Sequence, residues 1–68
     1  MNTKAELKQA LNYLDIAESN IHHYSAMLKV CDPANIDTVE QLDRQLHWAE
    51  LMRVEQIVAI KRYADELS

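Results

Sequence analysis

The chain has 68 residues and a net charge of −4, and it contains no glycine, no phenylalanine, one proline and one cysteine. A chain of this length supports one domain with a thin core, a lone cysteine excludes an internal disulfide, and the acidic balance disfavours general binding to nucleic acid or acidic lipid. The lack of glycine also disfavours β-hairpins, whereas the abundant Ala, Leu, Glu, Gln, Lys and Arg favour helices, so the composition predicts an all-α protein.

The first predicted element is a helix over about residues 4–31. Thr3 followed by Glu6 has the pattern of a capping box, and Pro33 disfavours helix at Asp32, so the helix should end just before these residues. Apolar side chains recur along it at alternating intervals of three and four residues, which is typical of a coiled-coil-like seam. This predicted seam consists of Leu7, Ala10, Leu14, Ala17, Ile21, Tyr24, Leu28 and Cys31.

After a loop over 32–36, a second helix is predicted over about 37–67. Asp37 with Glu40 forms another capping-box pattern, and Thr38 with Gln41 is an overlapping alternative. Two helices of similar length joined by a short loop predict an antiparallel hairpin. The seam predicted for the second helix consists of Val39, Leu42, Leu46, Ala49, Ile57, Ile60, Ala64 and Leu67.

Arg53 interrupts the second seam. In an antiparallel hairpin that turns near residue 35, facing residues have numbers that sum to about 70, because both helices rise equally per residue. Arg53 should then lie beside Ala17 and Glu18, which predicts a partly buried Glu18–Arg53 ion pair that fixes the register. In the alternative interpretation, Arg53 extends to water along its aliphatic stem.

Several apolar residues lie outside both seams. At about 100° per residue, Trp48 falls nearly opposite the core face of the second helix. Clustered exposed apolar residues that include Trp and Met mark interfaces, and Trp, Tyr and Arg often dominate their energetics. The predicted partner-binding residues are Trp48, Leu51, Met52, Arg44, Tyr13 and Ile16; Met27, Val30, Val54 and Val58 also lie outside the seams.

Two occupants of this apolar surface are compatible with the sequence. Small two-helix chains seldom fold alone, so the surface is first interpreted as the core of a homodimeric four-helix bundle. It could instead accept a helix or a groove of another protein, whose identity the sequence does not specify. The two interpretations are not exclusive.

No arrangement of residues indicates catalysis or a cofactor, so a non-enzymatic protein is expected. His22, His47, Asp43 and Glu50 are weak candidates for a metal site between the helices, but solvated surface residues are the favoured interpretation, since the Glu-x-x-His spacing of di-iron bundles is absent. Cys31 continues the apolar seam and is expected to pack in the core.

The sequence therefore predicts a cytoplasmic protein–protein interaction module that acts as an adaptor or regulator. Cytoplasmic location is expected because there is one cysteine and no apolar segment typical of a signal peptide or membrane span. The alternative function is an acidic inhibitor that mimics nucleic acid and blocks a nucleic-acid-handling complex. In size, acidity and lack of catalytic motifs the chain is similar to short accessory proteins of bacteriophages and other mobile elements. The acidic flank consists of Asp15, Glu18, Glu40, Asp43, Glu50 and Asp65, and Lys8, Lys29 and Lys61 dilute it.

Overall fold

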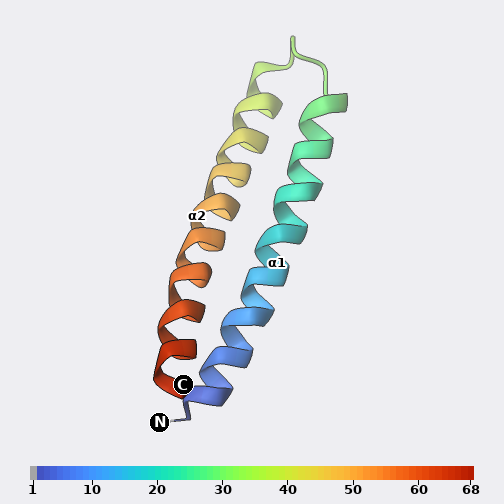
Figure 1. The fold of residues 1–68 in the computed structure, drawn as a ribbon. Helices are drawn as coiled ribbons and strands as arrows, with labels where there is room; N and C mark the ends of the chain where they lie inside the picture. Colours follow the sequence, from blue (N-terminus) through green and yellow to red (C-terminus); the bar gives the residue numbers. More distant parts are fainter. Residues whose placement is uncertain (1) are drawn as a thin grey trace.

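The computed structural model describes residues 2–68, which form two antiparallel α-helices and, within that range, no strand. Helix α1 spans Thr3–Val30 and helix α2 spans Ile36–Leu67, with 28 and 32 residues. The helices run along each other, with the loop at one end of the hairpin and both termini at the other (Figure 1). The all-α hairpin is thus confirmed, and each helix begins and ends within one residue of its expected bounds.

Asparagine residues cap both helices at their N-termini. The side-chain oxygens of Asn2 and Asn35 each accept a hydrogen bond from the backbone N–H three residues further on, at 3.3 and 3.4 Å. The capping boxes expected to begin at Thr3 and Asp37 are therefore wrong, because these residues already lie in the first helical turns. Asparagine is among the best N-cap residues, since its short side chain reaches an N–H that has no partner within the helix.

The loop turns without glycine by means of Asp32 and Pro33. The Asp32 carbonyl accepts a hydrogen bond from the Asn35 N–H at 3.0 Å, and its carboxylate accepts one from the Ala34 N–H at 2.9 Å. Proline fixes φ near the value required at the second position of such a turn. No residue in the described part of the chain has a positive φ, so the turn needs no glycine.

The core between the helices is thin and consists mainly of alanine. Ala17 is 0% exposed, and Ala10, Leu42 and Ala49 are the other side chains that are buried within residues 2–68. Small residues at these positions allow the two backbones to approach closely, but they bury little apolar surface. The remaining six residues of the seam predicted for α1 are all half-buried, so that seam is confirmed along its whole length.

On α2 the predicted seam residues are buried or half-buried as far as Ile60, and the prediction fails only at its last two residues. The observed seam continues from the buried Ala49 to the half-buried Gln56 and Tyr63 at intervals of seven residues, whereas Ala64 and Leu67 are exposed. A straight helix drifts by about 20° per heptad, so helices that stay in contact supercoil and keep residues seven apart at the interface. The expectation for Ala64 and Leu67 is wrong because it followed apolar residues onto the flank of α2.

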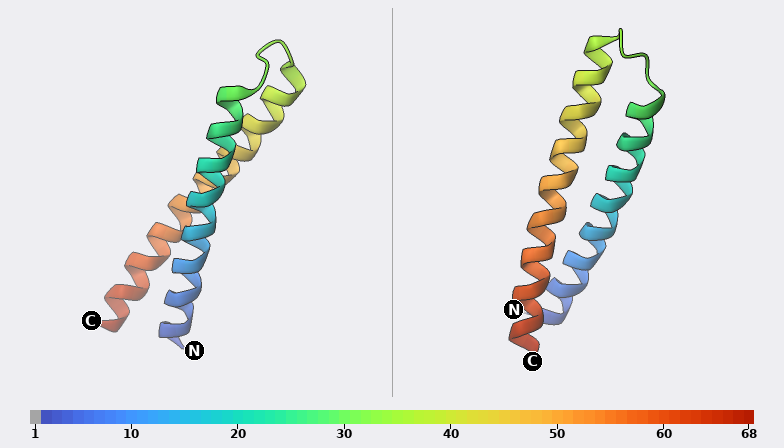
Figure 2. Two further views of the ribbon diagram at one scale, coloured as in Figure 1. Left: turned by 90° about the vertical axis from the view of Figure 1, so that its right-hand side faces the viewer. Right: turned by 45° about the horizontal axis from the view of Figure 1, so that its top comes forward.

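The hairpin is long and narrow, with extents of 51 × 16 × 13 Å, and its helices cross in the side view of Figure 2. Its radius of gyration is 15.4 Å, against about 11 Å for a compact chain of this length. Its accessible surface of 5359 Å² exceeds by roughly 950 Å² the value expected for a compact monomer of 7.9 kDa. Neither described helix has the length and apolar character that crossing a membrane requires.

Candidate interaction surface

The face of α2 that points away from α1 carries exposed apolar side chains. Trp48 is 64% exposed, Val58 60% and Leu51 42%. At about 100° per residue, Leu51 points roughly 160° away from the buried Ala49, so its side chain is directed away from α1. The sequence prediction placed Trp48 and Leu51 on this outer face, and both are exposed there.

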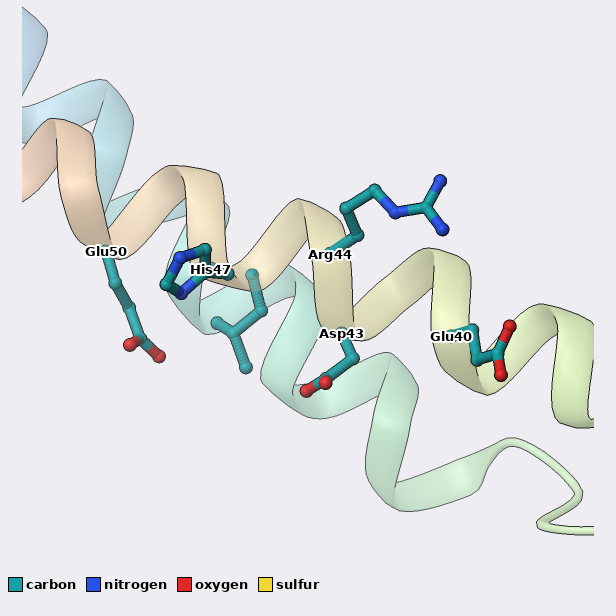
Figure 3. Close-up of a pocket in the computed structure, with 6 residues that line it drawn as sticks. Glu40, Asp43, Arg44, His47 and Glu50 are labelled. Atoms are coloured by element: carbon teal, nitrogen blue, oxygen red, sulfur yellow. The ribbon is translucent and has the colours of Figure 1, made fainter.

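Arg44 lies beside these apolar residues on α2. Its side chain is exposed, and its guanidinium extends away from Asp43, His47 and Glu50 (Figure 3). Arg44 precedes Trp48 by four residues, so the two occupy adjacent turns of one helix face. The expected combination of an arginine with an exposed tryptophan is therefore present on the outer face.

Met52, which was expected on the same outer face, is half-buried. It lies three residues after Ala49 and therefore only about 60° from it around the helix, on the flank next to α1. The expectation for Met52 is corrected accordingly. Its place in the observed seam is the one that the sequence analysis gave to Arg53.

The predicted residues of α1 are exposed on one flank of that helix. Tyr13 is 39% exposed and Ile16 44%, and Met27, 40% exposed, continues the same flank towards the loop. The Tyr13 hydroxyl accepts a hydrogen bond from Nε2 of Gln9 at 3.0 Å, which holds the ring along the helix. These residues form a second exposed apolar area, which lies on α1.

Tyr13 also contributes to a groove across both helices near the chain termini, which the sequence analysis did not predict. Ala10 and Ala59 lie in it on opposite helices, and the guanidinium of Arg62 stacks at 5.3 Å on the ring of Tyr63, one of its lining residues. The seven-residue repeat that reaches Tyr63 could have indicated this groove. It is lined by Glu6, Gln9, Ala10, Tyr13, Gln56, Ala59 and Tyr63.

Glu18 and Arg53 are both exposed, so the partial burial expected for their ion pair is wrong. The buried position at this level of the hairpin belongs to Ala17, and Glu18 follows it at about 100° around α1. Residues that line the groove from the two helices, such as Tyr13 and Gln56, have numbers within one of the expected sum. The pairing of Glu18 with Arg53 stays a prediction, now for two solvated side chains.

A shallow hollow on α2 collects Asp43, His47 and Glu50, three of the four weak metal candidates (Figure 3). The fourth candidate, His22 on α1, does not line it. Within residues 2–68, no group of three or more His, Cys, Asp or Glu side chains is arranged to hold a metal ion. The hollow combines three carboxylates with one arginine and one histidine; its lining residues are Glu40, Asp43, Arg44, Leu46, His47 and Glu50.

The thiol of Cys31 is half-buried where α1 ends, as expected for a seam residue. Its Sγ donates a hydrogen bond to the carbonyl of Leu28 at 3.4 Å. Its backbone N–H donates to the carbonyl of Met27 at 2.9 Å and closes the last turn of α1. Both contacts are structural, so the side chain packs against its own helix.

The chain matches no protein-family model, and no curated protein or solved structure is significantly similar to it. Its function therefore has to be inferred from its own residues, among which the exposed apolar face of α2 is the most distinctive feature.

Proposed function

We propose that this chain is a non-catalytic helical protein–protein interaction module, which assembles as a homodimeric four-helix bundle and serves as an adaptor or regulator. The observation that carries the proposal is the apolar outer face of α2, where Trp48, Leu51 and Val58 are exposed although the core between the helices is thin. Contiguous exposed apolar residues of this kind mark interaction surfaces.

The surface area of the hairpin supports an assembly. A standard interface buries about 800 Å² per partner, and the hairpin exposes roughly 950 Å² more than a compact monomer of its mass. One partner of ordinary size would therefore remove most of the excess. Chains of this size that lack disulfides commonly gain their missing core by oligomerising.

A dimer built on α2 leaves the flank of α1 for a second protein. Tyr13, Ile16 and Met27 lie on that flank and are about 40% exposed. An adaptor needs two such surfaces, one for its own assembly and one for its target. The free thiol of Cys31 suits a reducing compartment, so we place this activity in the cytoplasm.

Sedimentation equilibrium across a concentration series tests the proposal. At micromolar concentration the chain should have about twice the 7.9 kDa mass of one copy, and it should be strongly helical by circular dichroism. A folded, monodisperse monomer at these concentrations would contradict the dimer. The outer face of α2 would then be assigned to a foreign protein.

A further inference from the structure

A second heptad stripe runs along the outer face of α2. Its residues follow one another at alternating intervals of four and three, which is the spacing with which one helix packs on another. Every one of them is exposed, and the stripe extends for about 38 Å at 1.5 Å per residue, over most of the helix. The stripe consists of Asp37, Gln41, Arg44, Trp48, Leu51, Glu55, Val58 and Arg62.

This stripe is complementary to its own reversed copy. When two such stripes are placed antiparallel with Trp48 against Leu51, Arg44 faces Glu55. In the same register Asp37 faces Arg62, so every charged residue of the stripe faces an opposite charge. The apolar pair lies at the centre, and each remaining pair consists of Gln41 and Val58.

We propose that the partner on this face is a second copy of the chain, whose α2 packs antiparallel on the first about a two-fold axis between Trp48 and Leu51. The inference rests on the proposed function and adds the contact face, the direction and the register. A two-fold interface requires one self-complementary surface, and the stripe provides it.

The charges also disfavour the competing arrangements. Parallel packing would place Arg44 against Arg44 and Glu55 against Glu55, and like charges that face each other repel. A shift by one heptad in one direction brings Arg44 against Arg62, and the opposite shift brings Asp37 against Glu55. The antiparallel register centred between Trp48 and Leu51 therefore places opposite charges together, whereas each of these shifts places like charges together.

The side chains are oriented in a way that permits these pairs. Arg44 extends away from the acidic residues beside it on α2, as Figure 3 shows, so its guanidinium points outward from the helix. The guanidinium of Arg62 lies over its neighbour Tyr63 and keeps its N–H donors for a carboxylate, because the stacking uses only the face of the group.

Complementary charge reversal tests the register. Arg44→Glu sets two carboxylates against each other at the pair with Glu55, and Glu55→Arg sets two guanidinium groups against each other there. Each variant alone should therefore dimerise about tenfold more weakly than the wild type. An equimolar mixture should form a heterodimer with clearly higher affinity than either homodimer. In the heterodimer, position 44 faces position 55 twice: one contact has the wild-type charges, and the other has the same two charges exchanged. Glu50→Arg is the matched control, since it changes charge equally on α2 but lies off the stripe, and it should dimerise normally.

Disulfide trapping measures the register independently of charge. In a Cys31→Ser background, chains with Gln41→Cys mixed with chains with Val58→Cys should form a cross-linked heterodimer on oxidation. Either variant alone should cross-link poorly, since the two copies of residue 41 would lie about 26 Å apart.

The outcomes separate this inference from the proposed function. If the wild type dimerises but the charge variants do not recover on mixing, or if Gln41→Cys links to itself, the register is wrong while the dimer stands. If the wild type is a monomer, the register and the proposed dimer both fall, and the outer face of α2 is left to a foreign protein. Recovery of the mixed charge variants together with selective cross-linking supports the antiparallel contact.

Discussion

Trp48 and Ala49 are neighbours on α2 with opposite environments: the indole is 64% exposed, whereas the alanine is 6% exposed against α1. The two side chains differ by about 100° around the helix, which is enough to move from the outer face to the seam. Folding and association should consequently respond to different substitutions on this one turn.

Truncation of Trp48 should affect association and spare the fold. Trp48→Ala removes no contact in the thin core, so helicity should be nearly unchanged, while dimerisation should weaken by at least about 2 kcal/mol, as expected of an interface anchor. Circular dichroism and sedimentation equilibrium measure the two effects separately. The control is Leu42→Ala, whose buried side chain should cost about 2–5 kcal/mol of folding stability. Equal unfolding by both substitutions would place Trp48 in the core.

Enlargement of Ala17 should destabilise the hairpin. Its side chain is 0% exposed between the two helices, so Ala17→Leu forces the backbones apart and should cost about 1–3 kcal/mol in urea unfolding. Ala26→Leu makes the same change at an exposed position of α1 and should have little effect. If the two variants unfold at the same urea concentration, the close approach of the two helices at Ala17 does not contribute to stability.

Removal of the Asn35 cap should weaken the start of α2. Asn35→Ala leaves the Thr38 N–H without its side-chain acceptor and should cost about 1 kcal/mol, measured by thermal unfolding. Asn20→Ala is the matched control, because Asn20 is exposed in the middle of α1, where alanine is the better helix former. A cap variant as stable as the wild type would show that this hydrogen bond is not needed.

The Glu18–Arg53 interaction should be small but measurable. Because both side chains are exposed, a double-mutant cycle of the two charge reversals should give a coupling of about 0.3–1 kcal/mol, which salt should reduce. The double reversal should regain much of the stability that each single reversal loses. A coupling below about 0.2 kcal/mol would mean that the pair does not contribute to the stability of the hairpin.

The sequence predicts the seam of α1 completely because its apolar residues repeat without interruption. On α2 the polar Gln56 is half-buried along with Ile57 and Ile60, while the apolar Ala64 and Leu67 are exposed, so hydrophobicity alone does not locate the seam. The caps were missed for a related reason: a capping-box pattern at Thr3 masked the better cap one residue earlier at Asn2.

The candidate site could be predicted in part. The exposure of Trp48 and Leu51 follows from their angular position relative to the apolar seam, which the sequence contains. The half-burial of Met52 follows from the same rule, because Met52 lies only three residues after Ala49, but the sequence analysis assigned this position of the seam to Arg53. By contrast, the groove beside Tyr13 requires knowledge of which residues face each other across the helices.

Both ends of the chain lie at the end of the hairpin remote from the turn (Figure 1). The turn is separated from them by most of the 51 Å length of the molecule. Fluorophores attached at the two termini would therefore report whether the hairpin is closed, whereas a fluorophore at Ala34 would stay distant from either terminus in the folded chain. A loss of energy transfer between the terminal labels would therefore report opening of the hairpin, independently of whether the assembly dissociates.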